Sequence, residues 1–292
     1  MTDEPWTIGR LLNWTTEFLT EKGSASARLD AEVLLAHARG CQRIELYTAF
    51  EETAGDDLRA SFRELVQQRA AGKPVAYLVG HREFFSLSFR VTPDVLIPRP
   101  ETEQLVVRAL DIAKEAGSTS LRIADIGTGS GVLAVCLAKH LPEAAVTATD
   151  ISPAAIEVAR RNAADHGVDD RIEFVEADLF GQLPAEPAFD LIVSNPPYIT
   201  TAEMAELDPG VRDYEPHAAL HGGGQGTDVI ERLLPAAAER LRPGGRLLIE
   251  VSPATAGPAA SLAEQTPGLT HVETHADLAG HPRVVEYLRE EG

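Results

Sequence analysis

The stretch that decides the fold runs from Asp125 to Gly131 and reads DIGTGSG. An apolar run, residues 121–126, leads into it, and a helical pattern, residues 132–139, follows it. Glycine has no Cβ, so such a turn can bend tightly and approach a ligand closely, while the helix start offers free N–H groups to an anionic group. The stretch therefore predicts a strand, a nucleotide-binding turn and a helix; a purely structural turn is the alternative.

Beyond residue 120, apolar runs typical of strands alternate with helical patterns. The seven candidate strands are residues 121–126, 145–149, 172–176, 189–194, 246–251, 270–275 and 284–288. Apolar strands that alternate with helices predict an α/β fold with a mostly parallel sheet covered on both faces. Such folds bind ligands at the carboxyl ends of their strands.

The N-terminal part of the chain has a different organisation. Residues 7–72 show helical periodicity and predict a small helical module. Between Pro74 and Pro98 the pattern changes to short β-rich runs, which predict a hairpin-like connector with turns at residues 80–81 and 93–94. Those runs are residues 75–79, 84–91 and 95–97. The predicted domains are a helical domain (1–73), a hairpin connector (74–98) and a catalytic domain (99–292).

Composition narrows the possible function classes. The 292 residues are 44% hydrophobic and 24% charged, which is ordinary for a globular protein and excludes a disordered chain. The net charge of −19 disfavours binding to a phosphate backbone. Cys41 and Cys136 form no CxxC pair, the N-terminus is acidic and no apolar run approaches about 18 residues, so we expect a cytoplasmic protein without disulfides.

Further residues indicate an adenosine-containing cofactor. Asp150 ends the next strand about twenty residues on, where a carboxylate can accept hydrogen bonds from both ribose hydroxyls; its alternative role is to cap the helix that opens at Ser152. Asp178 and Leu179 follow the third strand and could read adenine or form an ordinary turn. Val132 replaces the third glycine of the dinucleotide fingerprint, which argues against NAD. The predicted cofactor-binding residues are Gly127, Thr128, Gly129, Ser130, Gly131, Asp150, Asp178, Leu179 and Asn195.

The tetrapeptide Asn195-Pro196-Pro197-Tyr198 directly follows a predicted strand. Neither proline has an N–H, so the loop presents the Asn195 side-chain oxygen and the Pro196 carbonyl as acceptors without competing donors. Together these two oxygens can hold one planar NH₂ group, and the Tyr198 ring adds a flat surface against it. The alternative is a proline-rich strand exit without a function.

Other constellations point to weaker hypotheses. His221 begins a His-Gly-Gly-Gly run like that of some esterases, but the chain has no GxSxG motif, which excludes such a hydrolase. Residues 222–226 predict a mobile loop that could act as a lid. Arg99 and Glu101 could line the site or anchor the following helix. Two histidine pairs have i, i+4 spacing, but neither fits HExxH, so we predict no metal: His217 with His221, and His271 with His275.

The glycine-rich stretch and the Asn195–Tyr198 tetrapeptide together resemble class I methyltransferases, which use S-adenosylmethionine to methylate a planar nitrogen in DNA, RNA or protein. The rest of the chain resembles the release factor glutamine methyltransferase (PrmC/HemK) family over nearly its whole length. That resemblance lies in residues 74–80, 84–89, 95–103, 214–216 and 219–220.

The resemblance implies a Rossmann-like, seven-stranded class I methyltransferase domain and a helical domain that helps to dock the substrate. It also implies methylation of the side-chain nitrogen (N5) of the glutamine in the Gly-Gly-Gln motif of peptide chain release factors. Asn195, Pro196 and Tyr198 would be catalytic, and Pro197 would join them in binding the substrate. A ribosomal protein glutamine or a nucleic-acid base amine is the alternative substrate. Residues 251–255 depart from the family pattern, which continues there with a glycine and then a glutamine.

Overall fold

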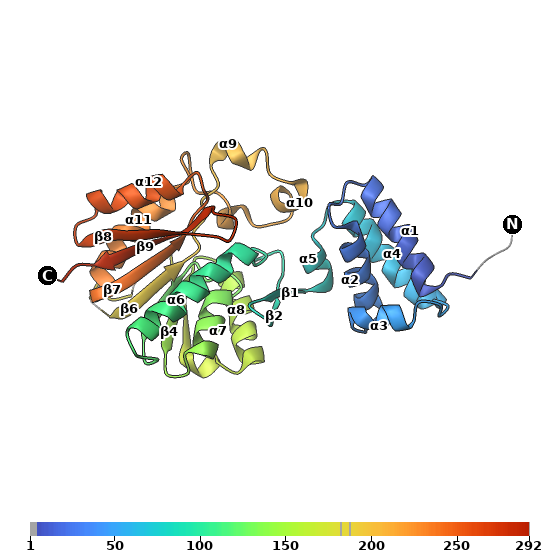
Figure 1. Ribbon diagram of the computed structural model, residues 1–292, viewed down its shortest axis with the longest axis horizontal. Coiled ribbons are helices and arrows are strands. Elements are labelled where there is room, and N and C mark those ends of the chain that lie inside the picture. Colours follow the sequence, from blue (N-terminus) through green and yellow to red (C-terminus); the bar gives the residue numbers. More distant parts are fainter. Residues whose placement is uncertain (1–4, 182, 187, 292) are drawn as a thin grey trace. The chain divides into compact units, whose positions relative to one another are not determined.

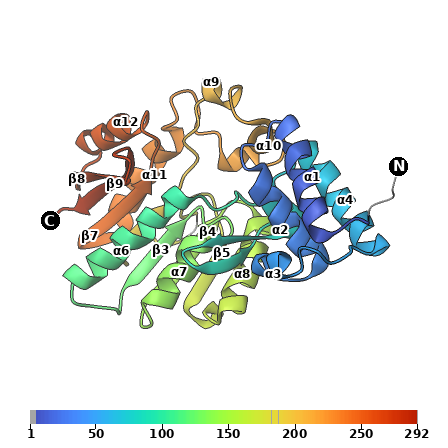
Figure 2. The same cartoon turned by 45° about the vertical axis from the view of Figure 1, so that its right-hand side comes forward.

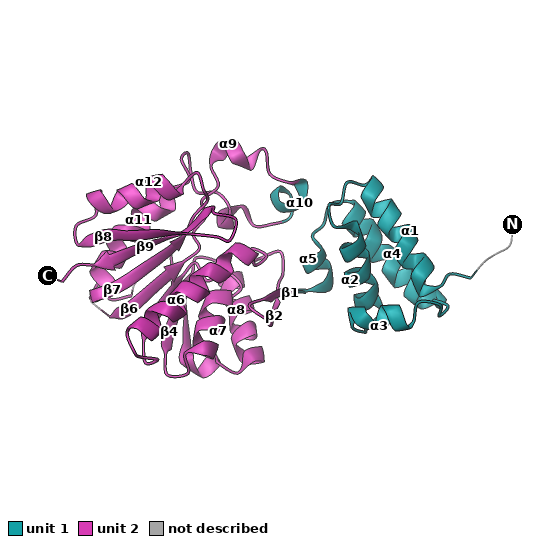
Figure 3. Ribbon diagram, viewed as in Figure 1, with its two compact units in different colours: residues 1–81, 209–214 teal, residues 82–208, 215–292 magenta. Residues whose placement is uncertain are grey.

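The computed structural model describes residues 5–181, 183–186 and 188–291. Contacts divide the chain into two compact units, which Figure 3 distinguishes by colour. The first comprises residues 1–81 and 209–214, and the second comprises residues 82–208 and 215–292. A short segment from the middle of the chain is therefore grouped with the N-terminal helices. None of the helices within the described ranges is long and apolar enough to cross a membrane.

The first unit is a helical bundle, as the periodicity predicts. Its helices are α1 (Ile8–Glu21), α2 (Ala27–Arg39), α3 (Arg43–Thr48), α4 (Asp56–Ala70) and α5 (Val75–Val79). The short α10 (Pro209–Arg212) also belongs to this unit. The Thr7 hydroxyl caps α1 by accepting a hydrogen bond from the Arg10 N–H at 3.2 Å. Leu12, Leu34 and Leu35 are fully buried in its core, so apolar burial holds the bundle together.

The structure corrects several details of the predicted connector. Residues 75–79 form α5 rather than a strand, because Pro74 begins a helical turn and Gly80, with φ of 79°, ends it in the left-handed conformation. The hairpin itself is shorter than predicted and pairs β1 (His81–Phe84) with β2 (Leu87–Arg90). Its turn lies at Phe85 and Ser86, both with positive φ, rather than at residues 80–81 and 93–94. Residues 95–97 form no strand.

The second unit contains the seven-stranded sheet, and the predicted fold class is confirmed (Figure 1). Its strand order is β5-β4-β3-β6-β7-β9-β8, where the first five in that order are parallel and β8 and β9 are antiparallel to their neighbours. The strands are β3 (Arg122–Ile126), β4 (Ala145–Asp150), β5 (Ile172–Glu176), β6 (Phe189–Ser194), β7 (Leu241–Glu250), β8 (Leu269–Ala276) and β9 (Pro282–Arg289). The chain leaves β3 toward β4 on one side and returns as β6 on the other, which creates a switch point for ligand binding.

Helices cover both faces of this sheet (Figure 1, Figure 2). Successive residues of a strand point to opposite faces, so Ile123 packs in one core and Ala124 in the other. The first core contains α6 (Glu103–Glu115), α7 (Val132–His140) and α8 (Pro153–His166); the second contains α11 (Asp228–Arg240) and α12 (Ala256–Ser261). The remaining short elements are α9 (Thr201–Met204), η1 (Pro100–Thr102), η2 (Asp169–Arg171), η3 (His217–Ala219) and η4 (Leu262–Gln265).

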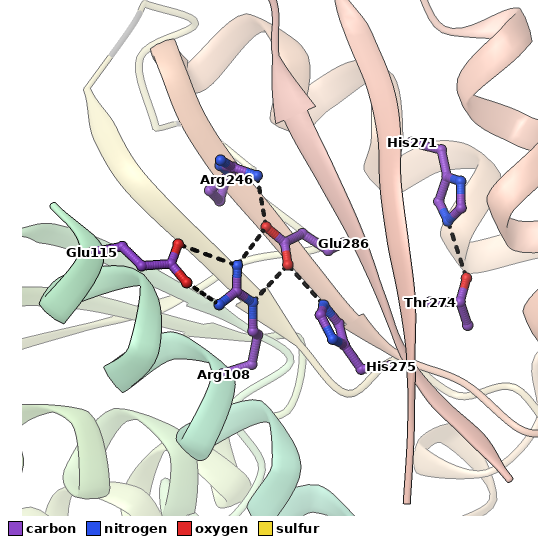
Figure 4. A network of polar contacts seen from close by, with 7 residues as sticks. All are labelled: Arg108, Glu115, Arg246, His271, Thr274, His275 and Glu286. Carbon is purple, nitrogen blue, oxygen red and sulfur yellow. Dashed lines mark hydrogen bonds and ion pairs between the residues drawn. The ribbon is translucent and has the colours of Figure 1, made fainter. Parts of the chain in front are cut away.

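A buried carboxylate ties α6 to the antiparallel edge of the sheet (Figure 4). Glu286 on β9 accepts hydrogen bonds from Arg108 Nε and Arg246 Nη1, each at 2.7 Å, and lies 2.8 Å from His275 Nε2. Burial opposes its ionisation, but the hydrogen bonds from Arg108 and His275 hold the pKa of Glu286 below its usual range. His271 and His275 lie on strand β8. Their i, i+4 spacing therefore does not place them on one face of a helix.

Candidate active site

The glycine-rich turn joins β3 to α7 at the switch point of the sheet. Gly127 and Gly129 have φ of 76° and 55°, and a Cβ at either position would meet nothing within 4 Å. Glycine is favoured at these two positions by backbone conformation, and the space beside them is open. Gly131 differs, because a Cβ there would lie 3.1 Å from the Cα of Ala159 on α8. It is favoured by close packing between α7 and α8 as well as by its φ of 82°.

Asp125, near the end of β3, holds this turn in place through hydrogen bonds. Its Oδ2 accepts hydrogen bonds from the Thr128 hydroxyl at 2.6 Å and from the Ala134 N–H at 3.1 Å. The side chain is fully buried, and burial raises the pKa of Asp125 to about 7. Asp125 therefore fixes the turn without entering the site. The sequence motif contains Asp125, but its local pattern gives no sign of this supporting role.

Asp150 holds the same turn from the neighbouring strand. Its Oδ2 accepts a hydrogen bond from the Gly129 N–H at 2.8 Å, and its Oδ1 accepts one from the Ser152 N–H at 2.9 Å. The N-cap of α8 is Ser152, whose hydroxyl accepts from the Ala155 N–H, so the alternative capping role of Asp150 is wrong. A carboxylate has about four acceptor positions, which leaves Asp150 two for a ligand.

Asp178 and Leu179 follow β5 on the other side of the site. The Asp178 carboxylate is half exposed and forms an ion pair with Arg232 Nη2 at 2.6 Å. Leu179 has a φ of 54°, and its carbonyl accepts a hydrogen bond from the Thr149 hydroxyl at 2.7 Å. The backbone of this segment is therefore fixed, whereas the Asp178 side chain already has a partner.

The Asn195–Tyr198 tetrapeptide leaves β6 beside the turn. Asn195 Nδ2 donates a hydrogen bond to the Thr102 hydroxyl at 3.1 Å. The Tyr198 hydroxyl donates to Oε1 of Glu250, at the end of β7, also at 3.1 Å. Burial and the neighbouring Glu250 raise the pKa of Tyr198, so its hydroxyl stays protonated. Both ends of the tetrapeptide are thus fixed by side chains from other elements.

The glycine loop of residues 222–226 packs directly on this tetrapeptide. A Cβ at Gly222 would lie 2.5 Å from the Pro197 carbonyl oxygen, and one at Gly226 would lie 2.4 Å from that of Tyr198. The Gly222 N–H also donates to the Ile199 carbonyl at 2.8 Å. Close backbone approach therefore requires glycine at both ends of the loop, and its predicted mobility stays a prediction.

The glycine-rich turn, Asp150, the Asp178–Leu179 segment and the start of the tetrapeptide line one cavity of about 370 Å³ in the second unit, whereas residues 222–226 do not. Most of the predicted site residues line it: Gly127, Thr128, Gly129, Ser130, Asp150, Asp178, Leu179, Asn195, Pro196 and Pro197. Gly131 and Tyr198 do not, because Gly131 faces Ala159 and the Tyr198 hydroxyl is bonded to Glu250. Arg99 lines the cavity, whereas Glu101 lies outside it, 4.0 Å from Arg283.

The sequence did not predict the side chains that hold the cavity-lining residues in place. Thr102 and Glu250 hold the tetrapeptide, and Glu215 pairs with Arg99. The sequence does contain weak indications of these residues. Thr102 lies in the stretch 95–103, Glu250 ends an apolar strand, and Glu215 precedes Pro216. Within the described ranges, no group of three or more His, Cys, Asp or Glu side chains is arranged to hold a metal ion.

Comparison with known proteins gives the family. The family profile of the PrmC N-terminal domain matches residues 10–80, and that of the methyltransferase small domain matches residues 102–207. A release factor glutamine methyltransferase from Rhodopirellula baltica is 52% identical over 285 residues, covering 97% of this chain and 96% of that protein. The chain belongs to the release factor glutamine methyltransferase family. A second relative of that name, from Geobacter sulfurreducens, is 45% identical and covers 98% of both chains.

Membership of this family confirms the predicted resemblance and makes the chain an enzyme of the methyltransferase class. Solved structures agree on the fold. A methyltransferase from Pyrococcus furiosus gives a TM-score of 0.51 at 19% identity, with 79% of this chain and 100% of that chain covered. The Thermus thermophilus 16S rRNA N2 G1207 methyltransferase, in complex with AdoMet and guanosine, gives 0.53 at 19% identity, with 72% and 50% covered.

Proposed function

We propose that this enzyme transfers a methyl group from S-adenosylmethionine to the side-chain nitrogen (N5) of the glutamine in the Gly-Gly-Gln motif of peptide chain release factors. The observation that carries the proposal is the hydrogen bond from Asn195 Nδ2 to Thr102. It occupies the donor end of the amide and leaves Oδ1 as the acceptor for an NH₂ group in the cavity that Asn195 lines. The names of the relatives support release factors as the substrate.

The cavity suits the methyl donor. Its volume of about 370 Å³ lies in the range of small-molecule sites. Gly127 and Gly129 leave open space beside the backbone, and Asp150 retains free acceptor positions for ribose hydroxyls. Leu179, which lines the cavity, would contact the adenine through its backbone. When bound, S-adenosylmethionine supplies an electrophilic methyl group on a sulfonium sulfur.

Asn195 and Pro196 would position the nucleophile. An amide nitrogen is weakly nucleophilic because its lone pair is delocalised into the carbonyl, so it must be held in line with the methyl group. Asn195 Oδ1 and the Pro196 carbonyl would each accept one N–H of the glutamine. Their dipoles would also stabilise the positive charge that develops on the nitrogen as the new N–C bond forms. The nitrogen becomes acidic at that stage, so its proton can leave to water without a strong base.

Tyr198 has a supporting role in this proposal. Its ring does not line the cavity, and its hydroxyl is bonded to Glu250. We therefore assign Tyr198 to holding the tetrapeptide rather than to stacking on the substrate, which revises the aromatic surface expected from the sequence. The helical unit is proposed to dock the release factor, and the cytoplasm, where translation ends, is the proposed place of action.

The test is methylation of a purified release factor. Incubation with this chain and S-adenosylmethionine should add one methyl mass to the peptide that carries Gly-Gly-Gln, as read by tandem mass spectrometry. The matched control is the same factor with that glutamine replaced by glutamate, which should stay unmodified. If the wild-type release factor stays unmodified, the proposed substrate is wrong. Salt-sensitive methylation of bare RNA or DNA would favour a base amine instead.

A further inference from the structure

Two arginines line the cavity, and they differ in how they are paired. Arg232 forms an ion pair at 2.6 Å with Asp178, which lines the same cavity. Arg99 is paired with Glu215, which does not line it. Arg99 is thus the cation that can serve an anionic group of a ligand. We propose that Arg99 binds the carboxylate of the methionyl group of S-adenosylmethionine. The proposal rests on the methyl donor proposed above.

Arg99 is held firmly and still has hydrogen-bond donors to offer. Its Nη2 donates to Glu215 Oε1, and the Glu215 side chain is 1% exposed and also accepts the Ile97 N–H. Among the described residues, this is the one hydrogen bond that the Arg99 guanidinium group makes. Because a guanidinium group carries five N–H donors in a planar fork, the others remain available for a carboxylate.

One guanidinium group can serve two carboxylates at once, and this chain contains an example. Arg108 pairs with both Glu115 and Glu286, each at 2.7 Å. The charge of Arg99 is therefore not used up by Glu215. A second carboxylate, supplied by the ligand, would complete the same kind of arrangement at the wall of the cavity.

The position of Arg99 matches the methionyl end of the donor. The Arg99 carbonyl accepts the Thr102 N–H at 3.2 Å, and the Thr102 hydroxyl accepts from Asn195 Nδ2. Arg99 therefore belongs to the short turn that contacts Asn195. The methyl group and the methionyl chain are attached to the same sulfur, so a methyl group aimed at the substrate beside Asn195 brings the methionyl chain to this part of the cavity.

The glycine-rich turn offers few free donors to a carboxylate. The N–H groups that already donate to other groups of the chain are those of Gly127, Thr128, Gly129 and Gly131. At the start of α7, the Ala134 N–H donates to the Asp125 carboxyl group. Asp125 therefore takes the place at this helix N-terminus that an anionic ligand would otherwise occupy. These contacts favour Arg99 over the turn as the partner of the methionyl carboxylate.

Calorimetric titration with two ligands tests the proposal without any turnover. Decarboxylated S-adenosylmethionine lacks only the carboxylate, so the ratio of the two dissociation constants reports contacts to that group. The wild type should bind S-adenosylmethionine about tenfold to a hundredfold more tightly, as expected for hydrogen bonds to one charged group. Arg99→Met should bring the ratio close to one. Arg99→Lys keeps the charge without the planar fork and should retain part of the preference.

Two further variants separate ligand binding from effects on the fold. Arg99→Met leaves the buried Glu215 charge without its partner, which can destabilise the protein. The double variant Arg99→Met, Glu215→Gln removes both charges and should show the same loss of preference. Arg232→Met, at the other arginine of the cavity, is the matched control and should keep the wild-type ratio.

The possible outcomes are distinct. A wild-type ratio in Arg99→Met and in the double variant would overturn the proposal, as would a wild type that binds both ligands equally. Equal weakening of both ligands would also overturn it, because Arg99 would then only shape the wall. If the wild type binds neither ligand, the proposed methyl donor is wrong and this role of Arg99 falls with it. If the preference depends on Arg99 but no release factor is methylated, only the proposed substrate fails.

Discussion

Arg99 Nη2 donates a hydrogen bond to Glu215 Oε1 at 2.5 Å, across 116 positions of sequence. The other Glu215 oxygen accepts from the Ile97 N–H at 3.1 Å, and the side chain is almost fully buried. One carboxylate therefore joins the segment that precedes α6 to the segment that follows the Asn195–Tyr198 tetrapeptide. Because Arg99 lines the cavity, this ion pair shapes one of its walls.

Glu215→Ala should destabilise the protein by about 2–3 kcal/mol. Removal of one partner of a buried pair costs about 3–5 kcal/mol, and the value here is lower because the Arg99 side chain is 31% exposed. Glu215→Gln still offers an acceptor to Ile97 and should cost less. Urea titrations give the free energy of unfolding of both variants. Equal losses of stability in the two variants would contradict the assigned role of the Glu215 charge.

Asn195→Ala should lower kcat about 10²–10³-fold, by analogy with the loss of one preorganised partner of a transition state. The substitution would remove the proposed side-chain acceptor for the substrate nitrogen and leave the glycine-rich turn of residues 127–131 untouched. Calorimetric titration should accordingly show little change in the affinity for S-adenosylmethionine. A variant that retains wild-type turnover would exclude Asn195 as the acceptor.

Asp150→Ala should weaken binding of S-adenosylmethionine about tenfold to a hundredfold, because hydrogen bonds to a charged group contribute about 1.5–3 kcal/mol. The carboxylate would hold the ribose and also orders the turn through Gly129. Asp165→Ala is a matched control, since Asp165 is an exposed surface residue paired with Arg90. Titration calorimetry compares the two, and equal affinities would argue against the ribose contact.

Gly222→Ala should reduce methyl transfer by about 10²-fold. The added methyl would collide with the backbone of Pro197 and Tyr198, and displacement of a catalytic group by about 1 Å has an effect of that size. Gly224→Ala is the matched control, because a Cβ there meets nothing within 4 Å. Steady-state assays should show a much lower rate of methyl transfer for Gly222→Ala than for Gly224→Ala. Equal rates would show that the loop adapts without moving the tetrapeptide.

Asp125→Asn should change the pH dependence of stability. The folded protein raises the pKa of Asp125 from 3.8 to about 7, so it binds the proton more tightly than the unfolded chain does. The wild type should therefore lose stability as the pH rises from about 4 to about 7, with each pKa unit worth about 1.4 kcal/mol at most. The asparagine variant should lose less over this window in denaturant titrations. Identical pH profiles would show that Asp125 is ionised at no cost.

The amino-acid sequence determined the strands, most helices and the two motifs of the site, because these follow from local patterns. The periodicity of apolar residues, the glycines of the turn at 127–131 and the prolines after Asn195 act over a few residues. The strand of residues 172–176 begins and ends where the pattern predicts. The run 75–79 was misassigned because Pro74 and Gly80 overrode the strand preference of its valines.

The tertiary structure alone decided how the site is supported. Thr102 and Asn195 are 93 positions apart, and Tyr198 and Glu250 are 52 apart, so no local pattern pairs them. Parallel strands bring the ends of β6 and β7 to one edge of the sheet, where Asn195 is hydrogen-bonded to Thr102 and Tyr198 to Glu250 in buried surroundings. The residue types near the reaction could be read from the chain, but the orientation of the Asn195 amide could not. That orientation depends on hydrogen bonds that exist only after the sheet has assembled.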